Sequence, residues 1–518
     1  MSEKVSNQPL LAADGTPLKS SLNRALRMQK LRALMLIAPL LIFVLITFIF
    51  PIYDMLFRSV ENDIVSNTLP RTVVQLENWS EDSGEAPGED VFAAFYTDLY
   101  LASEYKTHTR LGSRLNYQQT GISSLFRKTG RRVQRFDTDV YTDQFEALNP
   151  QWASPTFWAS FMDNERVQQL LPETASSYAG WREFIISEED DPNQETPEDF
   201  VYTSLYRDLM KLSERGASVR NADIRNGMNA VGSFESVSLK EQFIDADEDW
   251  ADPQYWATIK LYSGEYTSGY FLNAVDMEQT TDGAELKPEN ERIYGTLFAR
   301  TIYMSLFIMG CTILLGYPVA FLLANISRRS ANLLLILVLL PFWTSLLVRT
   351  SAWKVLLQQQ GVINDILVWS GLIDEAGRLI MINNQLGTII AMTHILLPFM
   401  ILPLYSVMQT IPPSYVRAAK SLGANDWTAF RRVYFPQSIP GIGAGSILVF
   451  IMSIGYYITP EIVGGTQGVF ISNRIAYHIS SSLNWGLASA LGAILLAVVL
   501  ILYWLYDRFV GIDNMKLG

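Results

Sequence analysis

The sequence predicts an all-α protein that crosses a membrane six times and carries a large, mainly helical domain outside the membrane. Hydrophobic residues make up 49% of the 518 positions, and they are gathered in long runs separated by polar stretches. Residues 58–295 contain no such run. The charge divides in the same way, because residues 61–291 hold 42 Asp and Glu against 19 Lys and Arg, and the remainder holds 10 against 21. We therefore expect an acidic external domain and a basic membrane part.

Six apolar runs approach the roughly 20 helical residues that cross a bilayer. They cover residues 33–57, 300–324, 331–350, 388–409, 440–460 and 485–506. Pro341 interrupts the third run and Pro398 and Pro403 the fourth, which predicts kinks whose freed carbonyls are satisfied inside a bundle. The first run is long for a signal peptide and precedes no small-residue cleavage site, so we expect an uncleaved anchor.

Basic residues in the short flanks predict the orientation of these runs. They cluster in residues 1–32, at Arg328 and Arg329, and between residues 411 and 436. Cytoplasmic flanks carry such an excess, whereas long translocated domains escape the rule. Residues 1–32 are therefore expected to form a basic cytoplasmic segment, both termini to be cytoplasmic, and residues 58–295 to lie on the other side.

The external segment contains two motifs that each occur twice in the same order. They are Tyr96-x-Asp98-Leu99-x-x-x-Ser103-Glu104 with Tyr206-x-Asp208-Leu209-x-x-x-Ser213-Glu214, and Trp152-Ala-Ser-Pro155-x-Phe-Trp158-Ala with Trp250-Ala-Asp-Pro253-x-Tyr-Trp256-Ala. We expect two similar helical halves, at about 89–162 and 198–261, with Ser154 and Asp252 as helix caps. Aromatic residues at helical spacing are usually core, and recognition of an organic cation by the repeated Tyr, Asp and Trp is the alternative.

Residues 411–436, IPPSYVRAAKSLGANDWTAFRRVYFP, predict a basic helix-turn-helix between the fourth and fifth runs. The prolines at 412–413 suit the start of the first helix, and Gly423 can adopt the left-handed conformation that ends it. Residues 425–426 can cap a second helix, which we expect Pro436 to end. Trp427, Phe430, Val433 and Tyr434 would share one face of that helix.

This segment resembles the coupling loop, or EAA loop, of ATP-binding-cassette importer permeases. The pattern of that loop is Glu-Ala-Ala, three residues, Gly, nine residues and Ile-x-Leu-Pro. The matching positions here are Arg417, Ala418, Ala419, Gly423, Val433, Phe435 and Pro436. Arg417 stands in place of the acidic residue. The resemblance implies contact with an ATPase subunit, and a basic amphipathic helix lying on anionic lipid is the alternative.

Two further stretches resemble the spermidine and putrescine permease branch of this family. One is Leu340-Pro341-Phe342-Trp343-Thr344-Ser345 with Arg349, Trp353 and Gly361-Val362-Ile363-Asn364, and the other is Ile458-Thr459-Pro460-Glu461-x-x-Gly464-Gly465. The resemblance covers residues 25–60 and 295–510. It implies a type I importer permease fold over 296–510 in the inner membrane, with residues 58–295 as a periplasmic insert that the small polyamine permeases lack.

The same resemblance implies a set of partners and a solute. The partners are two ATP-binding-cassette ATPase subunits, a second permease subunit that is either a copy of this chain or a different one, and a periplasmic solute-binding protein. The solute is a polyamine or a related small organic molecule. The competing interpretation is a membrane-anchored sensor or interaction protein whose duplicated external domain binds a ligand.

Charged and aromatic residues near the ends of the runs are candidates for a solute pathway. They are Trp343, Arg349, Tyr456, Tyr457 and Glu461. A charge at membrane depth costs at least about 3 kcal/mol, and aromatic rings attract organic cations. The equal alternative places the rings in the aromatic belt and Glu461 in headgroup water.

The sequence carries no motif for catalysis or metal binding. No segment reads Gly-x-x-x-x-Gly-Lys-Ser/Thr, so we expect the partner ATPases to bind the ATP. His108, His394 and His478 are far apart in sequence and have no partner at metal-ligand spacing. We expect His394 to be hydrogen-bonded inside the bundle, and we expect no enzymatic activity, no cofactor in this chain, no metal site and no nucleic-acid partner.

Overall fold

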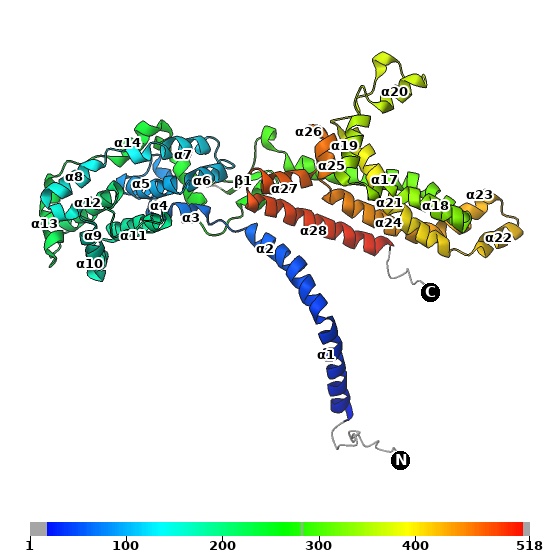
Figure 1. Ribbon diagram of the computed structural model, residues 1–518, viewed down its shortest axis with the longest axis horizontal. Helices are drawn as coiled ribbons and strands as arrows, with labels where there is room; N and C mark the ends of the chain where they lie inside the picture. Colours follow the sequence, from blue (N-terminus) through cyan, green and yellow to red (C-terminus); the bar gives the residue numbers. More distant parts are fainter. Residues whose placement is uncertain (1–17, 281–282, 511–518) are drawn as a thin grey trace.

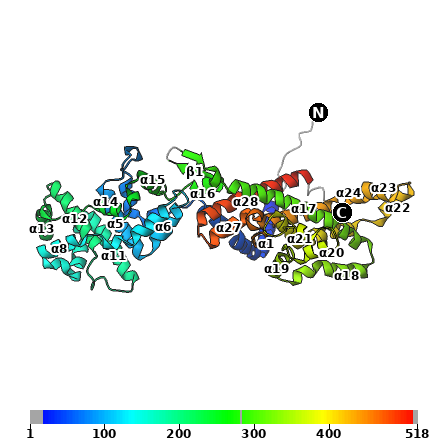
Figure 2. The same cartoon turned by 90° about the horizontal axis from the view of Figure 1, so that it is seen from above.

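The computed structural model describes residues 18–280 and 283–510, so residues 1–17 of the expected basic segment lie outside the described residues. Figure 1 shows a helical external domain at one end of a bundle of long helices, and Figure 2 shows the two parts end to end. The helices α1 (Leu18–Val44) and α2 (Phe50–Arg58) form a rod that leads away from both parts. The described strands are β1 (Met277–Thr280) and β2 (Gly283–Leu286), which pair antiparallel.

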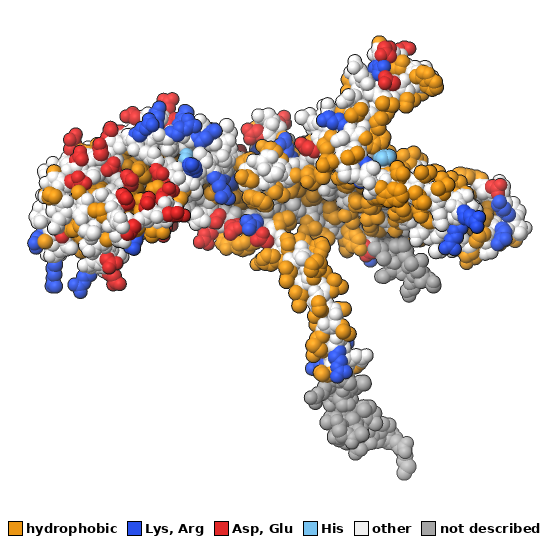
Figure 3. Space-filling view, viewed as in Figure 1, with side chains coloured by type: hydrophobic (Ala, Val, Ile, Leu, Met, Phe, Trp, Pro, Cys, Tyr) orange, Lys and Arg blue, Asp and Glu red, His pale blue; other side chains and the backbone are white. Residues whose placement is uncertain are grey.

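Five helical segments are long and apolar enough to cross a membrane, and a bent pair makes a sixth. The five are Leu26–Arg58, Tyr294–Asn325 (α17), Gln385–Thr410 (α21), Asp426–Gly455 and Trp485–Arg508, the last within α28 (Trp485–Val510). The bent pair joins Arg328–Trp343 to Leu346–Leu356 at 94°, and its break follows Pro341, where a kink was expected. Pro398 and Pro403 do not interrupt α21. In Figure 3 apolar side chains cover this part while charged ones gather at its two ends.

The structure corrects one predicted helix end in residues 411–436, here called the coupling segment, because Pro436 does not end the second helix of this segment. That helix continues from Asp426 to Gly455 through a π-helical turn, Phe430–Tyr434. Phe435 N–H donates to Phe430 O, five residues earlier. This wider turn accommodates the missing N–H and the bulky ring of a proline inside a helix. A second π turn, Leu45–Ile49, precedes Pro51 in the same manner.

Short, closely packed helices form the external domain. Their bounds are α3 (Ile64–Thr68), α4 (Pro70–Leu76), α5 (Glu89–Glu104), α6 (Thr107–Leu115), α7 (Ile122–Gly130), α8 (Asp139–Leu148), α9 (Pro155–Met162), α10 (Glu165–Leu170), α11 (Pro172–Ser187), α12 (Asp199–Glu214), α13 (Ala222–Ala230), α14 (Leu239–Ala246), α15 (Pro253–Leu261) and α16 (Gly269–Ala274). The repeated tryptophans Trp152, Trp158, Trp250 and Trp256 are all buried, which confirms the prediction that they are core. Trp158 Nε1 donates to Trp152 O at 2.8 Å, and Trp256 Nε1 donates to Trp250 O at 2.9 Å.

The two halves of this domain bury residues against each other. Phe95 of α5 packs on Trp250 and Trp256, which belong to the later half, with ring centroids 4.7 and 5.2 Å apart. In return, Tyr202 of α12 packs on Trp158 at 5.1 Å and donates to Trp152 O at 2.7 Å. The halves therefore share one core.

The predicted caps in this domain differ from each other. Asp252 Oδ1 accepts a hydrogen bond from Gln254 N at 2.9 Å, as predicted for a cap of α15. Ser154 lies at the start of α9, but its hydroxyl contacts the Thr156 hydroxyl instead of a backbone N–H.

Glycines allow α17, α21 and α24 (Phe435–Gly455) to pack closely. A Cβ on Gly445 would lie 2.6 Å from Met400 Sδ and 3.2 Å from its carbonyl oxygen, and one on Gly441 would lie 3.2 Å from Leu404 Cα. Small residues serve this purpose in membrane bundles. The other helices of this part are α18 (Arg328–Leu339), α19 (Leu346–Leu356), α20 (Val362–Trp369), α22 (Pro413–Ser421), α23 (Asp426–Ala429), α25 (Ile458–Val463), α26 (Gly465–Gly468) and α27 (Ile471–Ser480). Figure 1 shows α20 projecting away from the bundle.

Candidate coupling and transport surfaces

The coupling segment forms the predicted helix-turn-helix at the end of the bundle farthest from the external domain (Figure 1). Helix α22 follows Pro412, and Gly423 takes the left-handed conformation with φ of +93°. Asn425 Oδ1 then accepts a hydrogen bond from Thr428 N at 2.8 Å and caps α23. Turn chemistry therefore sets the angle between the two helices.

Aromatic stacking anchors the second helix of this segment to the bundle. The Phe430 ring stacks on Trp427 and on Tyr434, with centroids 5.8 and 6.1 Å apart. Phe430 and Tyr434 also meet Phe321 of α17 edge-on, at 5.8 and 5.1 Å. These ring contacts join the second helix of this segment to α17.

The outer surface of the coupling segment is both apolar and basic. Leu422 is 90% exposed and Trp427 67% exposed. Arg417, Arg431 and Arg432 are exposed as well, whereas Lys420 is paired with Asp426. Large exposed apolar side chains grouped at a charged tip are typical of interaction surfaces.

The predicted coupling residues fall into two groups on this surface. Arg417, Ala418 and Ala419 lie together on α22. Val433, Phe435 and Pro436 lie at the π turn and the start of α24. A hollow of about 490 Å³ lies between the coupling segment, α17 and α21, and Arg417, Lys420 and Phe430 are among its lining residues.

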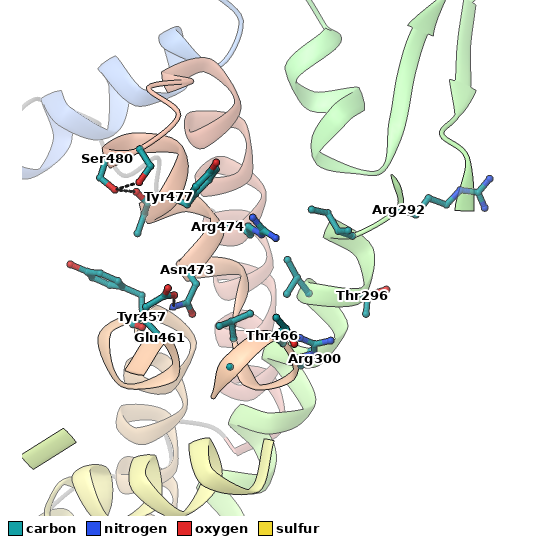
Figure 4. Close-up of a pocket in the computed structure, with 16 residues that line it drawn as sticks. Arg292, Thr296, Arg300, Tyr457, Glu461, Thr466, Asn473, Arg474, Tyr477 and Ser480 are labelled. Atoms are coloured by element: carbon teal, nitrogen blue, oxygen red, sulfur yellow. Dashed lines mark hydrogen bonds between the residues drawn. The ribbon is translucent and has the colours of Figure 1, made fainter. Parts of the chain in front are cut away.

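At the opposite end of the bundle, a hollow of about 680 Å³ lies between α17 and α25–α27 (Figure 4). Tyr457 and Glu461, two of the five predicted pathway residues, line it. Asn473 Nδ2 donates to Glu461 Oε2 at 2.7 Å and to Tyr457 O at 2.8 Å, which fixes both groups.

Arginines that sequence reasoning did not identify dominate the charge of this hollow. Arg292, Arg300 and Arg474 line it together with Glu461, and Arg300 donates to Thr466 O at 2.9 Å. Glu461 is therefore a carboxylate among three guanidinium groups in the wall of this hollow. Arg292 and Arg474 are 182 positions apart in the sequence. From the sequence alone these arginines were assigned no common role, because only the fold brings them to one place.

The other three predicted pathway residues do not line this hollow. Trp343 is 74% exposed beside the break that follows α18, and Arg349 is half-buried on α19. Tyr456 is also half-buried. Helix α19 packs on α25, where the Thr350 and Thr459 hydroxyls are 3.2 Å apart.

His394 has the hydrogen bond expected of it, because Trp353 Nε1 donates to His394 Nδ1 at 3.1 Å. The expectation that His394 lies inside the bundle is wrong, because its side chain is exposed on the surface of the described chain. Among residues 18–280 and 283–510, no group of three or more His, Cys, Asp or Glu side chains could hold a metal ion.

Comparison with known proteins gives the class of protein. Residues 313–511 match the family described as binding-protein-dependent transport system inner membrane component. The spermidine/putrescine transport system permease protein PotB of Haemophilus influenzae is 35% identical over 228 residues, 43% of this chain and 79% of that protein. The inner membrane ABC transporter permease protein YdcU of Escherichia coli is 33% identical over 262 residues, 48% of this chain and 81% of that protein.

The chain therefore belongs to the family of inner membrane components of binding-protein-dependent transport systems, and it is a multi-pass inner membrane protein. The family match begins after the external domain. A crystal structure of bacterial alginate ABC transporter in complex with alginate pentasaccharide-bound periplasmic protein aligns at 19% identity and a TM-score of 0.34. The alignment covers 43% of this chain and 81% of that chain.

Proposed function

We propose that this chain is the permease subunit of an ATP-driven importer for polyamines or a related small organic solute. The observation that carries the proposal is the exposed, apolar and basic helix-turn-helix at one end of a bundle that belongs to the transport family. The polyamine class is supported by the relatives named as spermidine/putrescine permeases, which are 32–35% identical to this chain.

The coupling segment is proposed to dock on an ATP-binding-cassette ATPase subunit. Arg417, Ala418, Ala419 and Gly423 on α22 and at its turn would form the contact, and Val433, Phe435 and Pro436 would pass the movement to α24. Covering Leu422 and Trp427 removes apolar area from water, at about 25 cal/mol per Å². Two ATPases would bind ATP and serve this chain and a second permease subunit.

The orientation proposed for the chain follows the charges at the two ends of the bundle. Arg328 and Arg329 begin α18 close to the basic coupling segment, so this end is cytoplasmic. The acidic external domain, at the opposite end, is then periplasmic, where a solute-binding protein would deliver the solute.

A pathway for a polyamine is proposed along α19 and α25, with the second permease subunit as its other wall. Trp343, Arg349, Tyr456, Tyr457 and Glu461 would face it, and Glu461 is the member that can pair with an ammonium group. Glu461→Gln is expected to raise the KM for spermidine uptake more than it lowers kcat. An unchanged KM would contradict this role.

The external domain is proposed to be an internal duplication that docks the binding protein. Asp98 accepts from the backbone N–H and hydroxyl of Thr72, and Asp208 accepts the same two bonds from Thr174, each at 2.7–2.8 Å. Both threonines lie in the first turn of a helix that begins with proline. Matched contacts of this kind support a common origin of the two halves.

Affinity purification of the tagged chain from its native membrane tests the proposed assembly. Mass spectrometry of co-purifying proteins is expected to identify an ATP-binding-cassette ATPase and a second permease subunit. Recovery of the chain alone, under mild detergent in which a known importer stays intact, would favour the sensor interpretation.

A further inference from the structure

A hollow of about 470 Å³ lies where the external domain meets the membrane helices. Residues 58–64, helix α6, the loop 481–484 between α27 and α28, and the first two residues of α28 each form part of its wall. Arg58 ends one candidate membrane span and Trp485 begins another, so the hollow lies at the level of a membrane surface. Leu483 and Trp485 beside it are exposed, as side chains that contact lipid at this level are.

Arg114 of α6 lines this hollow and is only 7% exposed. Its Nε donates to the Tyr270 hydroxyl at 2.8 Å, and its guanidinium lies over the Tyr270 ring, 4.2 Å from the centroid. Both terminal nitrogens are buried and have no hydrogen-bond partner among the described residues. A buried cationic donor without an acceptor is costly, so an oxyanion in the hollow would stabilise this arrangement.

Three other charged residues in the wall form no ion pair with any described residue, although Asp63 Oδ2 accepts a hydrogen bond from Asn67 at 3.0 Å. Arg110 is exposed, and within the described ranges neither it nor Arg114 forms an ion pair. Glu61 and Asp63 line the same hollow and pair with neither arginine. Arg58 is already held by Asp54 at 2.8 Å. The wall thus offers two unpaired cations and two carboxylates.

We propose that this hollow binds the zwitterionic headgroup of a membrane phospholipid. Its phosphodiester oxygens accept hydrogen bonds from Arg114 and Arg110, since guanidinium groups match phosphate geometry. Its ammonium group lies beside Glu61 and Asp63. The bound lipid then contacts both α6 of the external domain and the start of α28. It thereby sets the orientation of the domain relative to the membrane.

Lipid retention by the full-length chain tests this site. Wild type, purified in mild detergent and examined by native mass spectrometry, is expected to keep about one bound phospholipid per chain. Arg114→Gln and Arg110→Gln each remove a charge-assisted hydrogen bond and should weaken retention about tenfold or more. Arg131→Gln, an exposed arginine of the same domain outside the hollow, is the matched control and should retain the lipid.

Arg110 is exposed, so its variant keeps the test valid even where Arg114→Gln fails to fold. Nanodiscs of phosphatidylethanolamine should raise the Tm of wild type above that in phosphatidylglycerol, and Arg110→Gln should reduce that difference. Equal lipid retention by all four proteins would overturn the proposal. Stabilisation by free phosphoethanolamine in lipid-free micelles, with no phospholipid retained, would overturn the membrane as the source of the headgroup.

Discussion

Gly423 holds the turn of the coupling segment at φ of +93°, where an L side chain costs about 1–2 kcal/mol. Space is not the constraint, because a Cβ there meets nothing within 4 Å. Replacing it should therefore change the direction of α22 without disturbing the bundle. The effect of this replacement on transport distinguishes the two interpretations of the segment, a docking loop for the ATPase and a helix that lies on lipid.

Gly423→Leu is expected to abolish solute uptake while leaving normal amounts of the chain in the membrane. Gly423→Asn is the matched control, because asparagine tolerates the left-handed region, and it should retain most of the uptake. Uptake assays in cells together with quantitative immunoblots of the membrane fraction check both. Normal uptake by the leucine variant would contradict the coupling role.

Asp208 makes the stability of the external domain depend on pH. Burial raises the pKa of this carboxyl to about 6, above its ordinary value of 3.8, although Thr174 donates two hydrogen bonds to it. The folded state therefore binds the proton more tightly than the unfolded state. The resulting stabilisation is complete below pH 3.8 and is lost as pH rises through about 6, by about 3 kcal/mol.

Asp208→Asn should remove this contribution and flatten the pH dependence of the free energy of unfolding between pH 4 and 6. Tryptophan fluorescence during urea unfolding of the full chain in detergent follows it, because the external core is rich in buried tryptophan. Asp163→Asn, at an exposed position, should leave the dependence as in wild type. The same dependence in the Asp208 variant would show that another group is responsible.

Individual residues were predictable where their role is local. The buried tryptophans, the turn at Gly423 and the cap at Asn425 follow from spacing within a few positions. Arg114 and Tyr270 are 156 positions apart, and no local pattern relates them. Sequence reasoning therefore missed the sites that the fold assembles from distant segments.

The sequence predicted where helices occur better than it predicted the residues at which they end. The long apolar runs coincide with the five helical segments and the bent pair that are long and apolar enough to cross a membrane, because a bilayer demands length and hydrophobicity. Pro436 was wrongly expected to end a helix, since a π turn before it lets the helix continue. Phe430, the first residue of this π turn, packs on Phe321 of α17, a contact that no local rule includes.

The contact between α16 and α28 holds the external domain on the bundle. Gly486 lies directly against the Tyr270 ring, so an added Cβ would overlap ring atoms, and Tyr270 is itself held by Arg114. Gly486→Ala should push α16 away and increase hydrogen exchange of its backbone amides at least about tenfold. Gly310→Ala, where a Cβ meets nothing within 4 Å, is the control. Equal exchange in both would show that this contact does not hold the domain.

The molecule as a whole places the two surfaces that we propose for docking at opposite ends of one bundle (Figure 1). The coupling segment is at one end and the external domain at the other. A sensor needs no such coupling surface, so membership in the transport family and this layout favour the permease. The pairing of the external halves was not predictable, because each repeated motif could pack on its own half or on the other.

Deleting residues 65–290 and inserting a short linker tests the role of the external domain. If the domain docks the binding protein, uptake should fall strongly, whereas assembly with the ATPase, at the far end, should persist. Uptake and co-purification of the ATPase are measured on the same cells. Unchanged uptake would reject docking.

Reconstitution into proteoliposomes of the complex that co-purifies with this chain tests the proposed importer most directly. ATP hydrolysis is measured with the binding protein, with and without spermidine, and with Gly423→Leu as the uncoupled comparison. A permease for polyamines predicts that spermidine with its binding protein raises hydrolysis severalfold in wild type and not in the variant. The same basal rate with and without spermidine, in a complex that contains every subunit, would contradict polyamine import.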